Sequence, residues 1–218
     1  MDKLKTEVLV LGPVSTNAYI AYHGLSREAV IIDPAAEAKK IIDKIEELSL
    51  MPKAILLTHG HFDHIGAAEE VRRFFNIPIY ANEAEKELLE SAEYNCAKMF
   101  TGEDLSINAD IFLKDKEVFE MLGLQWEVIH TPGHTRGSCC YYIREEDLLF
   151  SGDTLFAGDY GRCDLYGGDH RAIIRSVLDK LFVLPDDTLV LPGHGGASRI
   201  ERERKRNVLS VYIGREIE

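Results

Sequence analysis

The sequence contains little cysteine, and its cysteines do not have the spacing of metal-binding or redox pairs. Only four occur among 218 residues, and no two of them have Cys-x-x-Cys spacing. Zinc sites built from thiolates and dithiol redox centres use such pairs, so the sequence argues against both. Because the spacing indicates no disulfide framework, we expect all four thiols to be reduced.

Long apolar runs are also missing. No stretch approaches the roughly 18 apolar residues of a membrane-spanning helix. The first residues contain a short apolar run that Pro13 interrupts, and they lack the basic start and small-residue cleavage site of a secretory signal. We therefore expect a cytoplasmic protein that does not act at a membrane.

Positive charge is scarce: 25 Lys and Arg residues stand against 37 Asp and Glu, which gives a net charge of -12. A field of this sign repels phosphate backbones, so no nucleic-acid partner is expected. The hydrophobic fraction of 45% and the charged fraction of 28% are ordinary for a globular protein. With no linker or low-complexity tract in view, we expect one domain over residues 1–218.

Short apolar runs alternate with amphipathic segments along the chain. Strands are expected at 6–12, 17–24, 28–34, 53–59, 77–82, 124–133, 138–144, 147–154 and 188–195. Helices are expected at 36–50, 67–75, 83–100 and 170–184, with a last one beginning at Ser198, where Glu201 completes a capping-box pattern. The turn-rich stretch 101–119 is expected to lie over the surface. Interleaved strands and helices indicate a layered α/β domain.

The segment "LLTHGHFDHIGA" (56–67) concentrates polar residues that bind metals. Three of the eight histidines and one aspartate fall within six positions, as His59, His61, Asp63 and His64. A polar surface loop is the alternative interpretation, but the pattern is rare and its flanks are apolar. A loop that directly follows a buried strand is also well held. The segment therefore predicts a metal site.

Three more residues of the same kinds follow predicted strands. They are His134 in "TPGHTRGS", Asp153 in "SGDTLF" and His194 in "LPGHG". Seven ligands exceed the four or so of one tetrahedral zinc, so we expect two divalent metal ions that share a bridging ligand. Imidazole and carboxylate donors favour zinc, and they also suit iron or manganese. Such a site stays cationic and favours a small anionic substrate. It also lowers the pKa of bound water to about 7.

Other polar residues are interpreted more simply. Asp33, in "VIIDP", is either a helix N-cap or an acceptor that orients a ligand histidine. His130 is interpreted as a hydrogen-bonded wall residue of a strand, His23 as a turn residue, and His170 as a residue near a helix start.

The segments "THGHFDH", "TPGHTRGS", "SGDTLF" and "LPGHG", in this order, resemble the metallo-β-lactamase superfamily. The resemblance implies a four-layer αββα sandwich with the metal site at one edge of two packed sheets. It implies that His59, His61 and His134 hold one ion and that Asp63, His64 and His194 hold the other. Asp153 would bridge the two ions. Asp63 and Asp153 would be the catalytic carboxylates, and a bridging hydroxide would attack the substrate directly.

Within that superfamily, "DTLFAGDYGRCD" makes the chain most similar to small glyoxalase-II-like thioesterases. Those proteins carry a basic residue in the place of Arg162, which implies that Arg162 contacts the anionic part of a thioester. A lactonase with the same seven ligands is an alternative. A persulfide dioxygenase, with one iron on His59, His134 and Asp153, is another. A true β-lactamase is disfavoured, because Asp153 stands where the best-known ones use cysteine.

Overall fold

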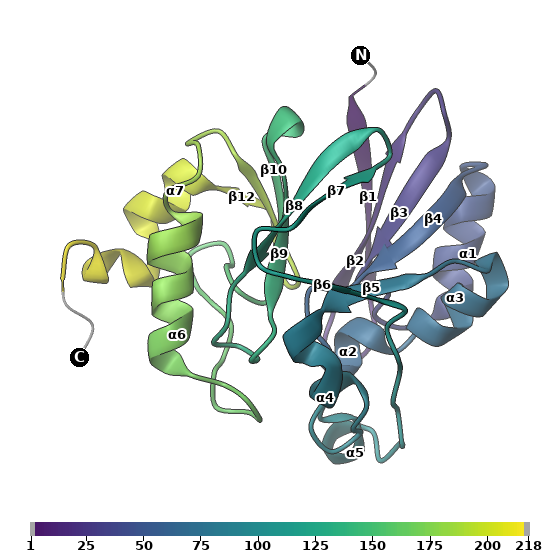
Figure 1. Cartoon of the computed structure of the whole chain (residues 1–218), viewed down its shortest axis with the longest axis horizontal. Coiled ribbons are helices and arrows are strands. Elements are labelled where there is room, and N and C mark those ends of the chain that lie inside the picture. Colours follow the sequence, from purple (N-terminus) through teal and green to yellow (C-terminus); the bar gives the residue numbers. More distant parts are fainter. Residues whose placement is uncertain (1–2, 216–218) are drawn as a thin grey trace.

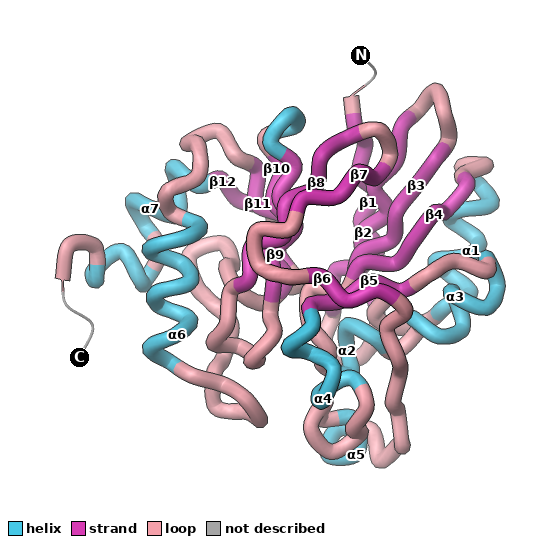
Figure 2. The backbone as a smooth tube through the Cα atoms, viewed as in Figure 1, coloured by secondary structure: helices cyan, strands magenta, loops and turns pink. Residues whose placement is uncertain are grey.

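In the computed structural model, which describes residues 3–215, the chain forms two six-stranded sheets (Figure 1). The first sheet has the order β1-β2-β3-β4-β5-β6 and the second the order β12-β11-β10-β9-β8-β7. Both sheets are mixed, since β3 to β6 run parallel, β10 and β11 run parallel, and the other neighbours are antiparallel. Figure 2 shows the strands of the two sheets meeting in the middle of the molecule. The strands are β1 (Leu4–Leu11), β2 (Thr16–His23), β3 (Glu28–Ile32), β4 (Met51–Leu56), β5 (Ile79–Asn82), β6 (Ile111–Leu113), β7 (Val118–Met121), β8 (Leu124–His130), β9 (Cys139–Ile143), β10 (Leu148–Gly152), β11 (Leu189–Pro192) and β12 (Ser198–Arg199).

Helices lie against the outer face of each sheet, and α2, α4 and α5 lie at one end of the sheets (Figure 1). In Figure 1, α1 and α3 lie against the first sheet, and α6 and α7 lie against the second. The helices are α1 (Ala38–Glu47), α2 (Phe62–Ile65), α3 (Ala68–Phe75), α4 (Lys86–Leu89), α5 (Ala97–Phe100), α6 (His170–Arg175) and α7 (Ile200–Arg206), and α6 continues as a π-helical segment over Ser176–Leu181. Within residues 3–215, none of these helices has the length and apolar character needed to cross a membrane.

Three buried clusters correspond to three interfaces between four layers. Tyr19 and Leu56 of the first sheet pack with Trp126 and Phe150 of the second in the central cluster. The outer clusters join the first sheet to α1 and α3, and the second sheet to α6 and its π-helical extension. β2 is buried on both faces, which explains its unbroken run of apolar and aromatic residues from Ala18 to Tyr22. The expected αββα sandwich is confirmed.

The segment 83–100 is not the single helix that its pattern predicts. The structure divides it into a 3₁₀ turn (Glu83–Glu85), α4 and α5, and Cys96 before α5 has a left-handed backbone with φ 68°. Asn95 explains the break, because its side chain accepts a hydrogen bond from Ala97 N and donates one to Leu105 O. The backbone carbonyl oxygen of Asn95 also accepts a hydrogen bond from Phe62 N at 2.9 Å. This tertiary contact with the histidine loop replaces the helical hydrogen bonds.

One smaller prediction is incomplete and another is wrong. The stretch 101–119 lies over the surface as predicted, since most of its residues are exposed, but it also contains β6 and the start of β7, each of which forms one edge of a sheet. The last helix begins at Ile200 and not at Ser198, which belongs to β12 and pairs with Val190. Ser198 forms no capping box with Glu201. Its hydroxyl donates instead to the buried carboxylate of Glu203.

Candidate metal centre

Loops at one end of the two sheets carry the predicted ligands. The histidine loop follows β4, His134 follows β8, Asp153 follows β10 and His194 follows β11. Parallel strands in each sheet bring their carboxyl ends to one edge. Backbone hydrogen bonds join the two sheets there, from Asn17 N to Gly193 O at 2.7 Å and from Cys139 N to Thr58 O at 2.9 Å. The sheets therefore bring together residues that lie far apart in the sequence.

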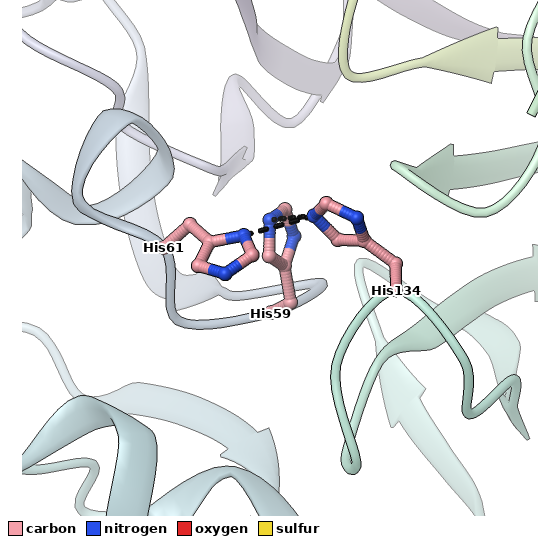
Figure 3. Close-up of side chains that lie close together, drawn as sticks. All are labelled: His59, His61 and His134. Atoms are coloured by element: carbon pink, nitrogen blue, oxygen red, sulfur yellow. Dashed lines mark hydrogen bonds between the residues drawn. The ribbon is translucent and has the colours of Figure 1, made fainter. Parts of the chain in front are cut away.

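Three histidines form a first triad, made of His59, His61 and His134 (Figure 3). Their potential ligand atoms all lie within 4.8 Å of one another. His134 Nε2 lies 2.8 Å from His61 Nδ1 and 3.2 Å from His59 Nε2. All three side chains are buried. Their facing nitrogens offer three donors to one ion.

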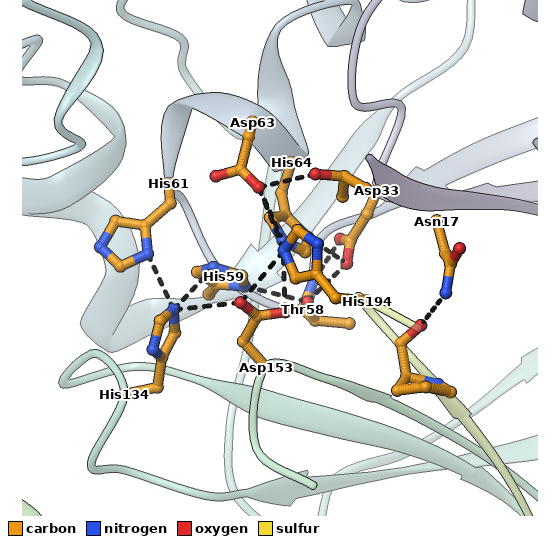
Figure 4. Close-up of polar contacts among 12 residues, drawn as sticks. Asn17, Asp33, Thr58, His59, His61, Asp63, His64, His134, Asp153 and His194 are labelled. Carbon is orange, nitrogen blue, oxygen red and sulfur yellow. Dashed lines mark hydrogen bonds and ion pairs between the residues drawn. The ribbon is translucent and has the colours of Figure 1, made fainter. Parts of the chain in front are cut away.

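Asp63, His64 and His194 form a second triad, and their potential ligand atoms also lie within 4.8 Å of one another. Asp63 Oδ2 lies 3.4 Å from His64 Nε2 and 3.3 Å from His194 Nε2. Asp153 lies between the triads, with its carboxylate 3.6 Å from His134 Nε2 and 3.4 Å from His194 Nε2 (Figure 4). A bridging ligand must touch both groups in this way.

Hydrogen bonding of the histidines provides a test of whether a cation fits. His134 Nδ1 lies 2.6 Å from the carbonyl oxygen of Arg162, so that nitrogen carries the proton. His59 Nδ1 lies 3.2 Å from Thr58 Oγ1, and the Thr58 hydroxyl already donates its hydrogen to Asp33. The hydroxyl oxygen can therefore only accept from His59, so Nδ1 of His59 also carries the proton. The Nε2 lone pairs of His59 and His134 therefore face each other in a buried space. A cation bound to both nitrogens removes that repulsion, so the residues fit a metal ion.

Unpartnered polar atoms favour the same conclusion at the second triad. His64 Nε2 and Asp153 Oδ1 are buried and have no hydrogen-bond partner in the described part of the chain, although they lie only 3.3 Å apart. Buried polar atoms are rarely left without partners. The backbone at Gly193 leaves no room for a side chain here, since a Cβ would lie 2.2 Å from Asp153 Oδ1. Glycine at residue 193 therefore allows Asp153 to lie this close to the second triad.

Burial and charge set the protonation of the two triads differently. Burial lowers the pKa of His59 and His134 and takes that of His61 to about 3, so these imidazoles are neutral, which is the form that binds metals. Burial also opposes charge on His64 and His194, but the surrounding carboxylates outweigh it. They hold the pKa of His64 well above its usual value and raise that of His194 to about 9. In the protein without metal, positive charge on the second triad thus compensates these carboxylates.

Asp33 lies behind the second triad and does not cap a helix, since the N-cap of α1 is Glu37. Its Oδ2 lies 2.9 Å from His64 Nδ1, and the carboxylate also accepts hydrogen bonds from Thr58 N at 2.8 Å and Thr58 Oγ1 at 2.6 Å. Of the two interpretations of Asp33, the structure therefore favours the acceptor that orients a histidine.

Asp33→Asn is expected to weaken metal affinity by roughly 10- to 100-fold, because the histidine loses the acceptor that fixes its ring. Asparagine suits the left-handed backbone of this residue, whose φ is 48°, so the fold should persist. Titration of the metal-free variant with Zn²⁺, followed by calorimetry, measures the change. Asp43→Asn, in an exposed ion pair with Lys39, is the control. Unchanged affinity in Asp33→Asn would show that the contact is only structural.

Glu85 supports both ligand loops, and sequence reasoning missed it. This carboxylate is 1% exposed, although it lies in a polar segment with two other glutamates. It accepts hydrogen bonds from Gly60 N at 3.0 Å, in the histidine loop, and from Gly137 N at 2.7 Å, beyond His134. The hydroxyl of Thr135 is a third donor to it. Glu85 thus joins the two loops that carry the first triad.

Two residues of β2, also missed by sequence reasoning, support the second triad. Thr16 Oγ1 donates to Asp63 Oδ2 at 2.7 Å. Asn17 Nδ2 donates to the carbonyl oxygens of Pro192 and Gly195, each at 2.9 Å, and so holds the His194 loop on both sides. No local sequence pattern distinguishes these residues from ordinary strand-end residues.

A cavity of about 180 Å³ opens onto the candidate metal centre. Members of both triads line it, together with Asp153, Cys96 and Arg162. Arg162 lies at this cavity as predicted, but its guanidinium is paired with Asp164 through two contacts, of 2.7 and 2.8 Å. The rim of the cavity therefore carries a largely compensated charge.

The remaining histidines lie outside the two triads. His130 Nε2 lies 2.8 Å from the carbonyl oxygen of Arg136, which agrees with the interpretation of a hydrogen-bonded wall residue. His170 is the first residue of α6, and its Nε2 lies 3.1 Å from the Tyr160 hydroxyl. His23 was predicted to be a turn residue, but it is the last residue of β2, directly before the turn that begins at Gly24.

Curated relatives cover nearly all of the chain. A probable metallo-hydrolase of Bacillus subtilis, YqgX, is 40% identical over 205 residues, which are 94% of this chain and 96% of the relative. The hydroxyacylglutathione hydrolase GloC of Haemophilus influenzae is 38% identical over 188 residues, with 83% and 86% of the two chains covered.

Solved structures match the fold closely. The B3 metallo-β-lactamase BLEG-1 superposes with a TM-score of 0.90 and is 41% identical, covering 94% of this chain and 98% of its own. TTHA1623 in a di-iron-bound form has a TM-score of 0.81 and 35% identity, with 93% and 98% covered. ETHE1 from Myxococcus xanthus has a TM-score of 0.75 and 26% identity, with 94% and 83% covered.

The family model for the metallo-β-lactamase superfamily matches residues 11–194. This range extends from the end of β1 to the histidine after β11, and it includes both triads and Asp153. Together with the four-layer fold and the relatives, the match shows that the chain belongs to the metallo-β-lactamase superfamily.

Proposed function

We propose that this protein is a hydrolase of anionic thioesters that works with two divalent metal ions. The convergence of the second triad on Asp153, beside a complete first triad, carries the proposal, because it provides a full ligand set for each ion. The name of the GloC relative supports thioesters as the substrate class. Zinc suits the donors, and the di-iron form of TTHA1623 supports iron as an alternative.

The residues of the chain have distinct tasks in this proposal. Two ions held by these residues would provide a hydroxide near neutral pH and a Lewis acid for the carbonyl oxygen of the thioester. Asp63 and Asp153 hold the ligand geometry from opposite sides, and Thr16 fixes the carboxylate of Asp63. The thiol of Cys96 is expected to stay protonated, since burial raises its pKa, so no side-chain nucleophile is assigned.

Arg162 and Asp164 are expected to control charge selection in opposite directions. Arg162→Ala should raise KM for an anionic thioester by about tenfold, since a guanidinium binds a carboxylate with charge-assisted hydrogen bonds. Asp164→Asn should lower that KM by roughly threefold, because it releases the guanidinium from its present partner. Steady-state kinetics on a glutathione thioester and on an uncharged thioester measure both effects. If KM for the uncharged substrate changed equally, charge selection by this pair would be ruled out.

One competing activity has an observation in its favour. ETHE1 is similar to this chain in structure, and the three residues of a one-iron dioxygenase site, His59, His134 and Asp153, lie close together here. We place the dioxygenase activity second, because such a site uses one iron and gives the second triad no role in metal binding. An assay of thioester cleavage by the metal-loaded protein tests the proposed function. If no thioester were cleaved and oxygen were consumed with glutathione persulfide, the order would be reversed.

A further inference from the structure

Two cavities adjoin the candidate metal centre and share Phe62 and Asp63 as walls. One is the cavity of about 180 Å³ that contains Arg162. The other has a volume of about 200 Å³ and is lined by Pro13, Ala36, Gly66 and Leu105, with Glu37 and Glu103 at its polar side. We call it the Phe62 cavity. An ester has two arms on its carbonyl carbon, and the two cavities offer a separate place for each.

The charges of the two cavities differ. The cavity at the metal centre contains the guanidinium of Arg162, whereas the Phe62 cavity contains no lysine or arginine among its lining residues. The carboxylate of Glu37 is already occupied, since it accepts a hydrogen bond from Gly12 N at 3.2 Å and pairs with Lys40. Glu103 has no ion-pair partner within residues 3–215 and lies at the rim, so the Phe62 cavity repels carboxylates.

The walls of the Phe62 cavity are fixed in place. The ring of Phe62 is stacked on that of Phe100, with centroids 5.3 Å apart and planes at 16°. Glu37 ties the turn at Gly12 to the start of α1. Gly66 passes so close to the backbone of Ala35 that a Cβ there would lie 2.5 Å from its carbonyl oxygen. A preformed cavity of this kind selects ligands by size.

We infer that the Phe62 cavity binds the acyl arm of the substrate and selects a short, uncharged, apolar acyl group. The anionic thiol arm then lies against Arg162. This assignment rests on the proposed function. Ligand cavities usually measure about 300–1,000 Å³, so one of about 200 Å³ has room for a short chain only. Asp63, a member of the second triad, lines both cavities, so this assignment puts the carbonyl carbon that joins the two arms beside Asp63.

Acyl chain length tests the inference directly. We would measure kcat/KM for acetyl, butyryl and hexanoyl thioesters of glutathione with the metal-loaded protein. Each buried methylene should raise kcat/KM roughly three- to fourfold until the cavity is full. Ala36→Leu narrows the cavity and should lower the hexanoyl-to-acetyl ratio by about tenfold. Leu105→Ala widens it and should raise that ratio by a similar factor.

Opposite shifts in the two variants exclude a general loss of structure, which would not change the ratio in two directions. Ala109→Leu is the matched control, because Ala109 is half-buried but does not line the Phe62 cavity. It should leave the ratio unchanged. Glu103→Gln should raise the rate with a glutaryl thioester, whose acyl arm ends in a carboxylate, several-fold more than the rate with the butyryl one.

The outcomes distinguish a failure of the acyl assignment from a failure of the proposed function. If the protein cleaves acetyl glutathione but neither Ala36→Leu nor Leu105→Ala changes the ratio, the acyl assignment is wrong and the proposed function stands. If no thioester is cleaved by the unaltered protein with a full metal content, the proposed function fails and the acyl assignment fails with it.

Discussion

Replacing Asp153 by alanine is expected to remove metal from both triads and to lower kcat/KM by about three orders of magnitude or more. The Asp153 carboxylate faces His134 of the first triad and both His64 and His194 of the second, so its loss affects both triads. Without it, each triad keeps three donors but loses the negative charge between the two ions. Metal content measured by plasma emission after dialysis, together with thioester kinetics, checks the result.

Asp159→Ala is the matched control for this variant. Asp159 lies in the same loop, its residue is exposed, and within residues 3–215 its carboxylate accepts a hydrogen bond from Tyr160 N and faces neither triad. It should keep its metal and its activity. A variant of Asp153 that retained two ions per chain and full activity would show that the two triads do not share this carboxylate.

Replacing Glu85 by alanine should give the largest loss of stability. Its carboxylate accepts hydrogen bonds from two backbone N–H groups and one hydroxyl, and all of them lie in buried loops. Removing a charged acceptor leaves these donors without partners, which costs about 3–5 kcal/mol. For a chain of this size, Tm should fall by roughly 6–20 °C. Differential scanning calorimetry of the metal-free protein measures the change without any contribution from bound ions.

A second variant, Glu85→Gln, tests how much of the stability depends on the negative charge of Glu85. Glu85→Gln keeps one acceptor oxygen but turns an amide group toward the same donors, so it should lose a large part of the same stability. Glu87→Ala is the control, because Glu87 is 58% exposed and its carboxylate contacts the side chains of Arg136, at 3.5 Å, and Tyr166 rather than buried backbone donors. If Glu85→Ala unfolded at the temperature of Glu87→Ala, the proposed support of the two loops would be wrong.

The candidate ligands could be predicted because their positions follow a physical rule. His134, Asp153 and His194 each come directly after a short apolar strand, and the ends of neighbouring strands meet at one edge of a sheet. The short apolar runs predicted buried strands, and β2, for example, is buried along nearly its whole length. Local pattern was therefore sufficient for a layered α/β domain and for the convergence of these side chains, whereas the four-layer αββα arrangement was implied by the resemblance to the metallo-β-lactamase superfamily.

Tertiary contacts account for what local pattern missed. The residues around Glu85 in the sequence are polar, as they are around exposed glutamates, so the sequence does not indicate that Glu85 is buried. Its burial between two loops results from the fold. The predicted helix over 83–100 breaks because Asn95 forms hydrogen bonds with the histidine loop and with Leu105. The ion pair of Arg162 with Asp164 was also unexpected, and it changes the expected effect of Arg162 on substrate charge.

Metal stoichiometry, measured together with activity on one preparation, tests the central claim most directly. The protein would be purified without added chelator and analysed for zinc, iron and manganese per chain. The same sample would be assayed for cleavage of a glutathione thioester and for oxygen uptake with glutathione persulfide. We predict about two ions per chain, thioester cleavage that a chelator abolishes, and no oxygen uptake. One iron per chain with oxygen uptake and no thioester cleavage would contradict the account.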